Sequence, residues 1–67
     1  MDTIKRVQDL MQERDMNLCV LAKKCGISYS TIQTTARRGG QLSVETIERI
    51  CLGLEITLKD FFHSSYL

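Results

Sequence analysis

The sequence predicts a compact all-α domain built as a five-helix bundle. Three observations favour this class: no proline interrupts the chain, β-branched residues do not alternate with polar ones over any useful length, and four glycines divide it into segments with helical periodicity. With 67 residues, the chain supports one domain, because a chain this short buries only about 60% of its unfolded surface. We therefore treat residues 1–67 as a single domain with a C-terminal tail at 63–67.

Two amphipathic helices are predicted in the N-terminal part, over residues 3–14 and 18–25. Their inward faces consist of Ile4, Val7, Leu10 and Met11 in the first helix and of Leu21, Ala22 and Cys25 in the second. Polar residues that can cap the two N-termini are Asp2 or Thr3, and Asn17. Gly26 is expected to end the second helix, since glycine readily adopts the left-handed conformation found there.

Three further helices are predicted, over residues 28–38, over 44–54 and in a short segment that starts at Thr57. Their apolar residues are Ile32 with Thr35 beside it, then Ile47, Ile50, Cys51 and Leu54, and finally Leu58, Phe61 and Phe62. Side chains placed to cap them are Ser28, Ser43, and Thr57 in a capping box with Asp60. The third helix should end at Gly39 and Gly40, whereas the fourth ends at Glu55, where a glycine is common and a larger residue is modestly strained.

The cysteines and the histidine do not form a pattern typical of a metal or catalytic site. Cys19, Cys25 and Cys51 are odd in number and lack metal-ligand spacing, and no sequence neighbour of His63 makes it part of a nucleophile and base arrangement. We expect reduced thiols, with Cys25 and Cys51 as small core residues. No enzyme activity, metal or cofactor is expected. The first residues show no apolar signal segment, so we expect a cytoplasmic protein without a membrane span.

The net charge of +1 is the sum of two opposed regions. The segment 16–44 contains four basic residues and no acidic one, whereas the rest of the chain contains five basic and eight acidic residues. The four central bases are Lys23, Lys24, Arg37 and Arg38. This distribution indicates one surface suited to an anionic partner.

The segment 17–38 has the spacing of a helix-turn-helix. Only Gly26 and Ile27 separate its two helices, and the small residue Ala22 stands where they would cross. The runs LAKKCGISYSTIQ (21–33) and LSVETIERICLGLEITLKDFF (42–62) resemble the Cro and repressor-type helix-turn-helix regulators of phages and bacteria, the XRE family. The resemblance covers residues 3–62 and implies a lambda-repressor-like DNA-binding domain, with 28–38 as the recognition helix in the major groove.

The resemblance also implies which side chains meet DNA. The residues expected at base edges are Tyr29, Ser30, Gln33 and Thr34, and those expected at phosphates are Asn17, Ser28, Arg37 and Arg38. A glutamine can pair in a bidentate manner with adenine. Other roles remain open: Tyr29 could be a packed surface aromatic, Gln33 and Thr34 could be only solvated, and the two arginines could serve the C-terminal helix dipole.

Some residues depart from the family pattern and support a different reading. Leu18 replaces a glutamine that touches DNA in many relatives, and Cys19 and Val20 extend an apolar start of the second helix. Thr35 stands where a larger aliphatic residue is usual. The alternative is therefore a protein-interaction module, antirepressor-like or antitoxin-like, in which residues 18–20 dock a partner and DNA affinity is low.

A homodimer on a palindromic double-stranded DNA operator is expected, because one short recognition helix offers few contacts. The expected dimer surface consists of Phe61, Phe62, Tyr66 and Leu67, since two adjacent phenylalanines should not both fit one core. Alternatively, one phenylalanine packs inside and the tail frays. No small-molecule ligand is expected as a partner.

Overall fold

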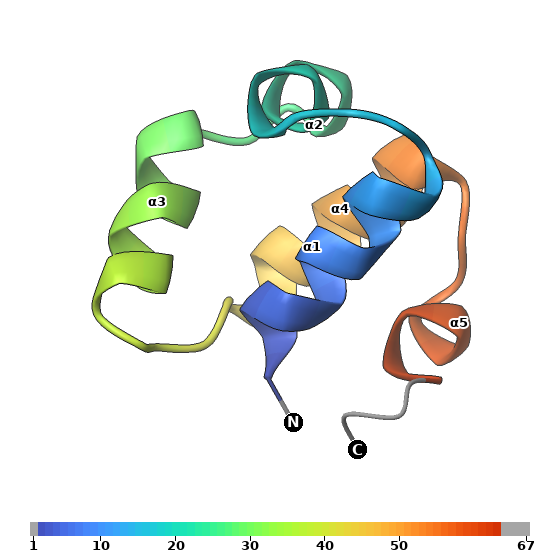
Figure 1. Cartoon of the computed structure of the whole chain (residues 1–67). Helices are drawn as coiled ribbons and strands as arrows, with labels where there is room; N and C mark the ends of the chain where they lie inside the picture. The colour runs from blue at the N-terminus through green and yellow to red at the C-terminus, as the bar shows by residue number, and fades with distance from the viewer. Residues whose placement is uncertain (1, 64–67) are drawn as a thin grey trace.

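A computed structural model describes residues 2–63. This part of the chain is all-α, as predicted, and measures 26 × 24 × 22 Å. Figure 1 shows α3 at one side of the molecule, α5 at the other, and α1 and α4 between them. No helix in residues 2–63 has the length and apolar character needed to cross a membrane. The helices are α1 (Thr3–Glu13), α2 (Leu18–Cys25), α3 (Tyr29–Arg37), α4 (Val44–Leu54) and α5 (Leu58–Phe62).

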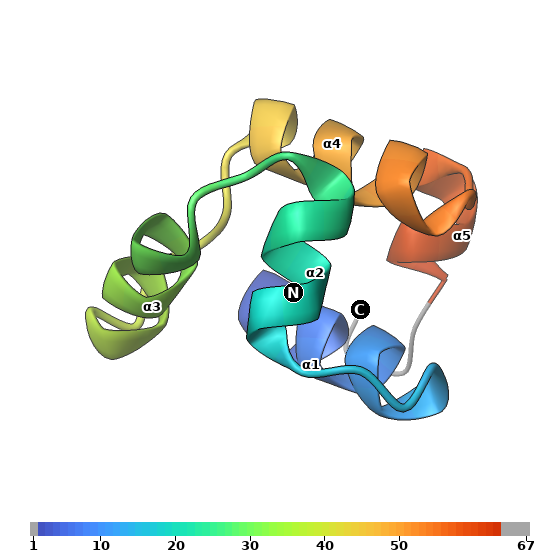
Figure 2. The same ribbon diagram turned by 90° about the horizontal axis from the view of Figure 1, so that it is seen from above.

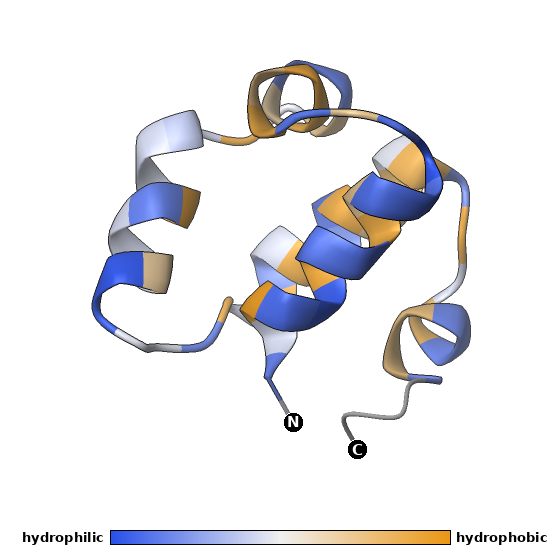
Figure 3. Cartoon of the chain, in the orientation of Figure 1, coloured by the Kyte–Doolittle hydropathy of each residue, from blue (hydrophilic) through white to orange (hydrophobic). Residues whose placement is uncertain are grey.

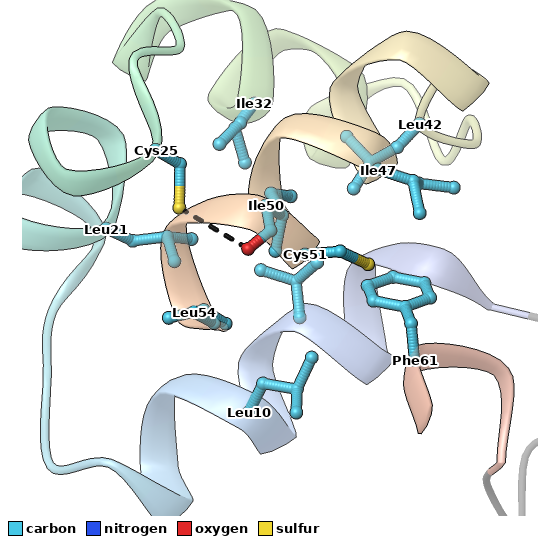
Figure 4. Packing of buried hydrophobic residues seen from close by; sticks show 11 residues of the cluster. Leu10, Leu21, Cys25, Ile32, Leu42, Ile47, Ile50, Cys51, Leu54 and Phe61 are labelled. Carbon is cyan, nitrogen blue, oxygen red and sulfur yellow. Dashed lines mark hydrogen bonds between the residues drawn. The ribbon is translucent and has the colours of Figure 1, made fainter. Parts of the chain in front are cut away.

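The core is built around α4, which contributes more buried residues than any other described helix. In Figure 3 the apolar stripes of α1 and α4 face each other, and in Figure 4 their side chains meet those of α2 and α5. Leu21, Ile50 and Phe61 are fully buried at this junction. Cys25 and Cys51 are also buried, as predicted, and both are free thiols. The remaining core residues are Val7, Leu10, Ala22, Ile32, Leu42, Ile47 and Leu54.

Helices α2 and α4 approach closely at one glycine. A Cβ atom built at Gly53 would lie 2.9 Å from the Cys25 Cα and would also overlap the Cys25 Sγ. Since real Cβ atoms do not approach backbone this closely, only glycine permits the two helices to cross at this distance. The Cys25 thiol lies 3.8 Å from the Ile50 carbonyl oxygen, to which it donates a weak hydrogen bond.

Most of the predicted helix caps are confirmed. Asp2, Asn17 and Ser43 each accept a hydrogen bond from a backbone N–H in the first turn of the helix that follows. Thr57 and Asp60 form the predicted capping box at the start of α5. The prediction for Ser28 was wrong in one respect: it occupies the N-cap position of α3, but its hydroxyl makes no cap hydrogen bond and lies 3.0 Å from the Ser30 hydroxyl instead.

The start of α1 holds the loop that follows α3. The Thr3 backbone N–H and hydroxyl both donate to the Gln41 Oε1, at 2.9 and 2.7 Å, and the Thr3 hydroxyl accepts from the Leu42 N–H. Arg6 on the same helix donates to the carbonyl oxygens of Phe61 and Asp60 at the end of α5. Helix α1 therefore makes hydrogen bonds both to the loop after α3 and to the end of α5.

Candidate nucleic-acid interface

The helix-turn-helix unit consists of α2, a tight turn and α3. Gly26 makes the turn in the left-handed conformation, with φ at 66°, and the Ile27 N–H donates to the Ala22 carbonyl oxygen at 3.0 Å. The Arg49 Nη1 of α4 donates to the Gly26 carbonyl oxygen at 3.1 Å, while its Nη2 pairs with the Glu45 carboxylate. The predicted turn is therefore present and is anchored to the core helix.

Helix α3 is attached to the rest of the domain mainly through one side chain. Ile32 is its only buried residue, and Thr35, the other residue predicted on this side, is half-buried and donates its hydroxyl to the Thr31 carbonyl oxygen. Figure 2, seen from above, shows α3 projecting from the body formed by the other helices. Most of the surface of α3 is therefore available to a partner.

The four side chains expected to face base edges all lie on exposed positions of α3: Tyr29, Ser30, Gln33 and Thr34. Two of them are in direct contact, because the Gln33 Nε2 donates to the Tyr29 hydroxyl at 2.8 Å. Tyr29 is 39% exposed. This face therefore carries hydroxyl and amide groups, which are suited to the donors and acceptors of base edges.

Cationic and amide groups lie at the ends of the two helices. Arg37 closes α3 and Arg38 is its C-cap residue, and both are exposed. Within residues 2–63, neither of these arginines nor the exposed Lys23 and Lys24 has a salt bridge or a side-chain hydrogen bond. Asn17 uses its Oδ1 to cap α2, at 2.9 Å from the Val20 N–H, so its amide N–H groups remain available to an acceptor.

The apolar start of α2 exposes less surface than its sequence suggests. Cys19 is exposed and Val20 is 47% exposed, but Leu18 is half-buried and packs against the core. Leu18 lines a groove of about 310 Å³ between α1, α2 and α3, which the sequence analysis did not anticipate. The other lining residues are Ile4, Val7, Gln8, Met11, Ile32, Gln33, Ala36 and Arg37.

The expected dimer surface requires one correction. Phe61 is completely buried, because it fills the core beside α1 and α4, so its side chain cannot contact a second copy. Phe62 is 36% exposed and meets the Phe61 ring edge-on, with ring centroids 5.1 Å apart. Tyr66 and Leu67 lie outside the described residues.

Two apolar residues near α5 are more exposed than the sequence indicated: Leu52 was not singled out, and Leu58 was counted only among the apolar residues of the fifth helix. Leu52 is 80% exposed and Leu58 is 43% exposed, and both line a shallow hollow with Cys51 and Ile56. The position of Leu52 could have been predicted, because it falls between the helically spaced Cys51 and Leu54 of the buried stripe and so points away from it.

Comparison with protein families identifies a match that covers most of the chain. A family model described as the Cro/C1-type HTH DNA-binding domain matches residues 6–63. No curated protein and no solved structure matches the chain. The match covers every helix except the first residues of α1, and it includes the turn between α2 and α3.

Proposed function

Because the chain belongs to the Cro/C1-type helix-turn-helix DNA-binding domains, we propose that it represses transcription by reading double-stranded DNA with α3 in the major groove. The observation that carries this proposal is the exposed polar face of α3. This helix projects from the core next to the tight turn at Gly26, and it ends in two arginines that have no salt bridge within residues 2–63. A nine-residue helix is about 13 Å long and fits the major groove.

Base edges are the proposed partners of Ser30, Gln33 and Thr34, whereas Tyr29 either reads a base edge or reaches a phosphate through its hydroxyl. Gln33 can pair with adenine through its amide, and the hydroxyls of Ser30 and Thr34 can contact several bases. The Thr34 methyl group can also meet a thymine methyl. Specificity on this proposal comes from four adjacent side chains within about one and a half helical turns.

Phosphates are the proposed partners of Asn17, Ser28, Arg37 and Arg38. Asn17 stands at the N-terminus of α2, where unpaired backbone N–H groups and the helix dipole favour an anion. The two arginines are free of intramolecular salt bridges within the described chain, so they need not break one to bind DNA. These contacts set the position of α3 on the duplex but do not distinguish sequences.

Two copies are proposed to bind together at a palindromic operator, since one α3 offers too few contacts for specific binding. The exposed apolar residues Phe62, Leu58 and Leu52 on and beside α5 favour a contact there. Sedimentation equilibrium should then show a dimer that Phe62→Ser weakens, whereas Val44→Ser, at another exposed apolar position, leaves it unchanged. A monomer at high concentration, with and without DNA, would contradict the dimer.

The test of DNA reading is a selection of binding sites from randomised duplexes at low salt. The expected result is a palindrome whose half-sites lie about one helical turn, or roughly 10 base pairs, apart. Gln33→Ala should abolish preference at one position of each half-site, whereas Gln12→Ala, an exposed glutamine on α1, should not. Repression is then measured with a reporter whose promoter overlaps the selected site.

Failure to select any duplex would overturn the proposal. It would favour the alternative of a protein-interaction module, for which the exposed side chains at the start of α2 are Cys19 and Val20.

A further inference from the structure

Tyr29 and Gln33 lie one turn apart on the exposed face of α3, and their polar groups are joined. The Gln33 Nε2 donates to the Tyr29 hydroxyl oxygen at 2.8 Å, a short distance for this type of bond. Both residues are exposed, so the contact is not forced by packing in the core. The pair therefore links two side chains that the proposed function directs toward the same stretch of DNA.

A glutamine amide that donates one N–H to tyrosine keeps two groups for another partner. These are its second N–H and its Oε1. Adenine presents the matching pair in the major groove, the N7 acceptor and the N6 donor. The contact with Tyr29 is thus compatible with a bidentate contact between Gln33 and adenine, and it leaves no polar group of the amide without a use.

An exposed glutamine amide is otherwise free to turn over. Its terminal torsion is broad and roughly two-fold, so the oxygen and nitrogen can exchange places at small cost. A turned amide places a donor where an acceptor is needed and loses the pattern that adenine requires. A fixed neighbour on one side of the amide is therefore needed if Gln33 is to discriminate among bases.

The Tyr29 hydroxyl can supply this fixed neighbour when its own proton is engaged. A phenol has one proton to donate, and its oxygen can accept. If that proton is donated to a phosphate oxygen, the hydroxyl can only accept from Gln33, which forces the nitrogen of the amide to face Tyr29. Leu18, the α2 residue that lines the same groove as Gln33, is apolar and cannot make such a bond.

We propose that Tyr29 is a positioning residue for base reading: it donates to a DNA phosphate, accepts from Gln33, and so holds the Gln33 amide in the orientation that reads adenine. This inference rests on the proposed function. It assigns Tyr29 no base contact of its own. It also makes the adenine preference depend on a side chain that does not touch the base.

The test measures binding of four proteins to the selected operator and to its three base variants at each position. The proteins are the unmodified chain, Tyr29→Phe, Gln33→Ala and the double variant. Tyr29→Phe should reduce the preference for adenine about fivefold at the position that Gln33→Ala affects, because one hydrogen bond no longer orients the amide. In the Gln33→Ala background, Tyr29→Phe should cause no further loss of preference there.

Thr34→Val is the matched control on the same helix face. It should alter a different base position, and its effect should be the same with Tyr29 or Phe at position 29. A different outcome is that Tyr29→Phe changes the base preference at an operator position that Gln33→Ala does not affect. That result would mean that Tyr29 contacts a base directly, and it would overturn the proposal. So would an equal loss of affinity for all bases, which indicates a phosphate contact without any effect on Gln33.

A second measurement separates this inference from the proposed function. Nuclear magnetic resonance of the DNA-free protein should show a Gln33 side-chain amide whose shifts change on Tyr29→Phe, while the Gln12 amide on α1 stays unchanged. If the Gln33 side-chain amide shows the same conformationally averaged shifts in the unmodified chain and in Tyr29→Phe, the hydrogen bond between Tyr29 and Gln33 is absent in solution. This result would overturn the proposal whether or not the protein binds DNA. Selection of no duplex, with the amide change present, would overturn the function and the positioning role but leave the contact itself standing.

Discussion

Glu55 ends α4 with a backbone conformation that suits glycine. Its φ and ψ are 58° and 42°, in the left-handed region, where a residue with a Cβ is strained by about 1 to 2 kcal/mol. A glycine there removes this strain but gives the unfolded chain more freedom, which costs about 0.4 to 1 kcal/mol. We predict that Glu55→Gly raises the free energy of unfolding by roughly 0.5 to 1 kcal/mol, measured by urea denaturation.

The matched control for this variant is Glu48→Gly. Glu48 is also exposed and lies within α4, in ordinary helical conformation, so its replacement should lower the free energy of unfolding by about 1 kcal/mol. Both variants remove one carboxylate, and a difference between them therefore reports on the backbone. Equal effects of the two glycines would contradict the assignment of strain to Glu55.

The three thiols differ in burial, and their reactivity should follow it. Burial raises the pKa of the Cys25 thiol and of the Cys51 thiol above the ordinary value of 9.0. Cys19 is exposed. We predict that an alkylating reagent at pH 8 labels Cys19 rapidly and the other two only as fast as the chain unfolds, as resolved by mass spectrometry of digested protein.

The raised pKa values of Cys25 and Cys51 also predict that the free energy of unfolding decreases at high pH. Because the pKa of each buried thiol is raised, the unfolded chain releases these protons first as the pH rises. The contribution of the two buried, neutral thiols to the free energy of unfolding is therefore complete below pH 9.0. It is lost as the pH rises above 9.0 and through the raised pKa values of the folded protein. Labelling of Cys25 at the rate of Cys19 in the folded protein would contradict the buried position of α2 against α4.

At the scale of whole helices, the crossing of α2 and α4 is the most restrictive contact. Alanine favours a helix over glycine by about 1 kcal/mol, but a Cβ at Gly53 would lie 2.9 Å from the Cys25 Cα. Since backbone cannot yield as a flexible side chain does, overpacking should dominate. We predict that Gly53→Ala lowers the free energy of unfolding by about 1 to 3 kcal/mol.

Gly40→Ala provides the comparison for this prediction. A Cβ at Gly40 would lie 3.7 Å from the Thr35 Cγ2, which is an ordinary contact. The free energy of unfolding should therefore change by no more than about 0.5 kcal/mol. Thermal melts of both variants provide the measurement, since 1 kcal/mol corresponds to about 4 to 8 °C in a domain of this size. A Gly53→Ala protein as stable as Gly40→Ala would mean that α2 and α4 can separate without cost.

The helices were predictable because each carries its own signals. Periodic apolar residues and a polar cap mark α2 and α4, and the predicted ranges 18–25 and 44–54 agree with the structure. The end of α1 at Glu13 differs from the prediction by one residue, since nothing local distinguishes it from Arg14. Ser28 shows the limit of local rules: its hydroxyl has a competing partner in Ser30, which the cap rule does not weigh.

The arrangement of the helices was less predictable, because it depends on contacts between distant residues. The adjacency of Phe61 and Phe62 in the sequence indicates that one of the two rings enters the core. Only the packing against α1 and α4 determines that the buried ring is that of Phe61. The groove between α1, α2 and α3 is lined by residues far apart in the sequence, among them Ile32, the only buried residue of α3. In the candidate site, the residue types followed from the family resemblance, whereas the contact of Tyr29 with Gln33 needed coordinates.

At the scale of the whole molecule, the position of charge should matter more than its sum of +1. The four cations Lys23, Lys24, Arg37 and Arg38 lie on α2 and at the end of α3, whereas Lys59 lies on α5, at the side of the molecule opposite α3 in Figures 1 and 2. A subunit that neutralises about four phosphates loses affinity with a log–log salt slope near −3 to −4. We predict that Arg38→Gln reduces this slope by about 0.9.

Lys59→Gln distinguishes position from total charge, because it removes the same unit of charge as Arg38→Gln. Lys59 is exposed on α5, and a contact with DNA made through α3 leaves it far from the phosphates. Its replacement should therefore leave the salt slope unchanged in titrations of the selected operator between about 50 and 200 mM salt. If both variants reduced the slope equally, binding would respond to net charge alone, and the cations at the end of α3 would have no special role.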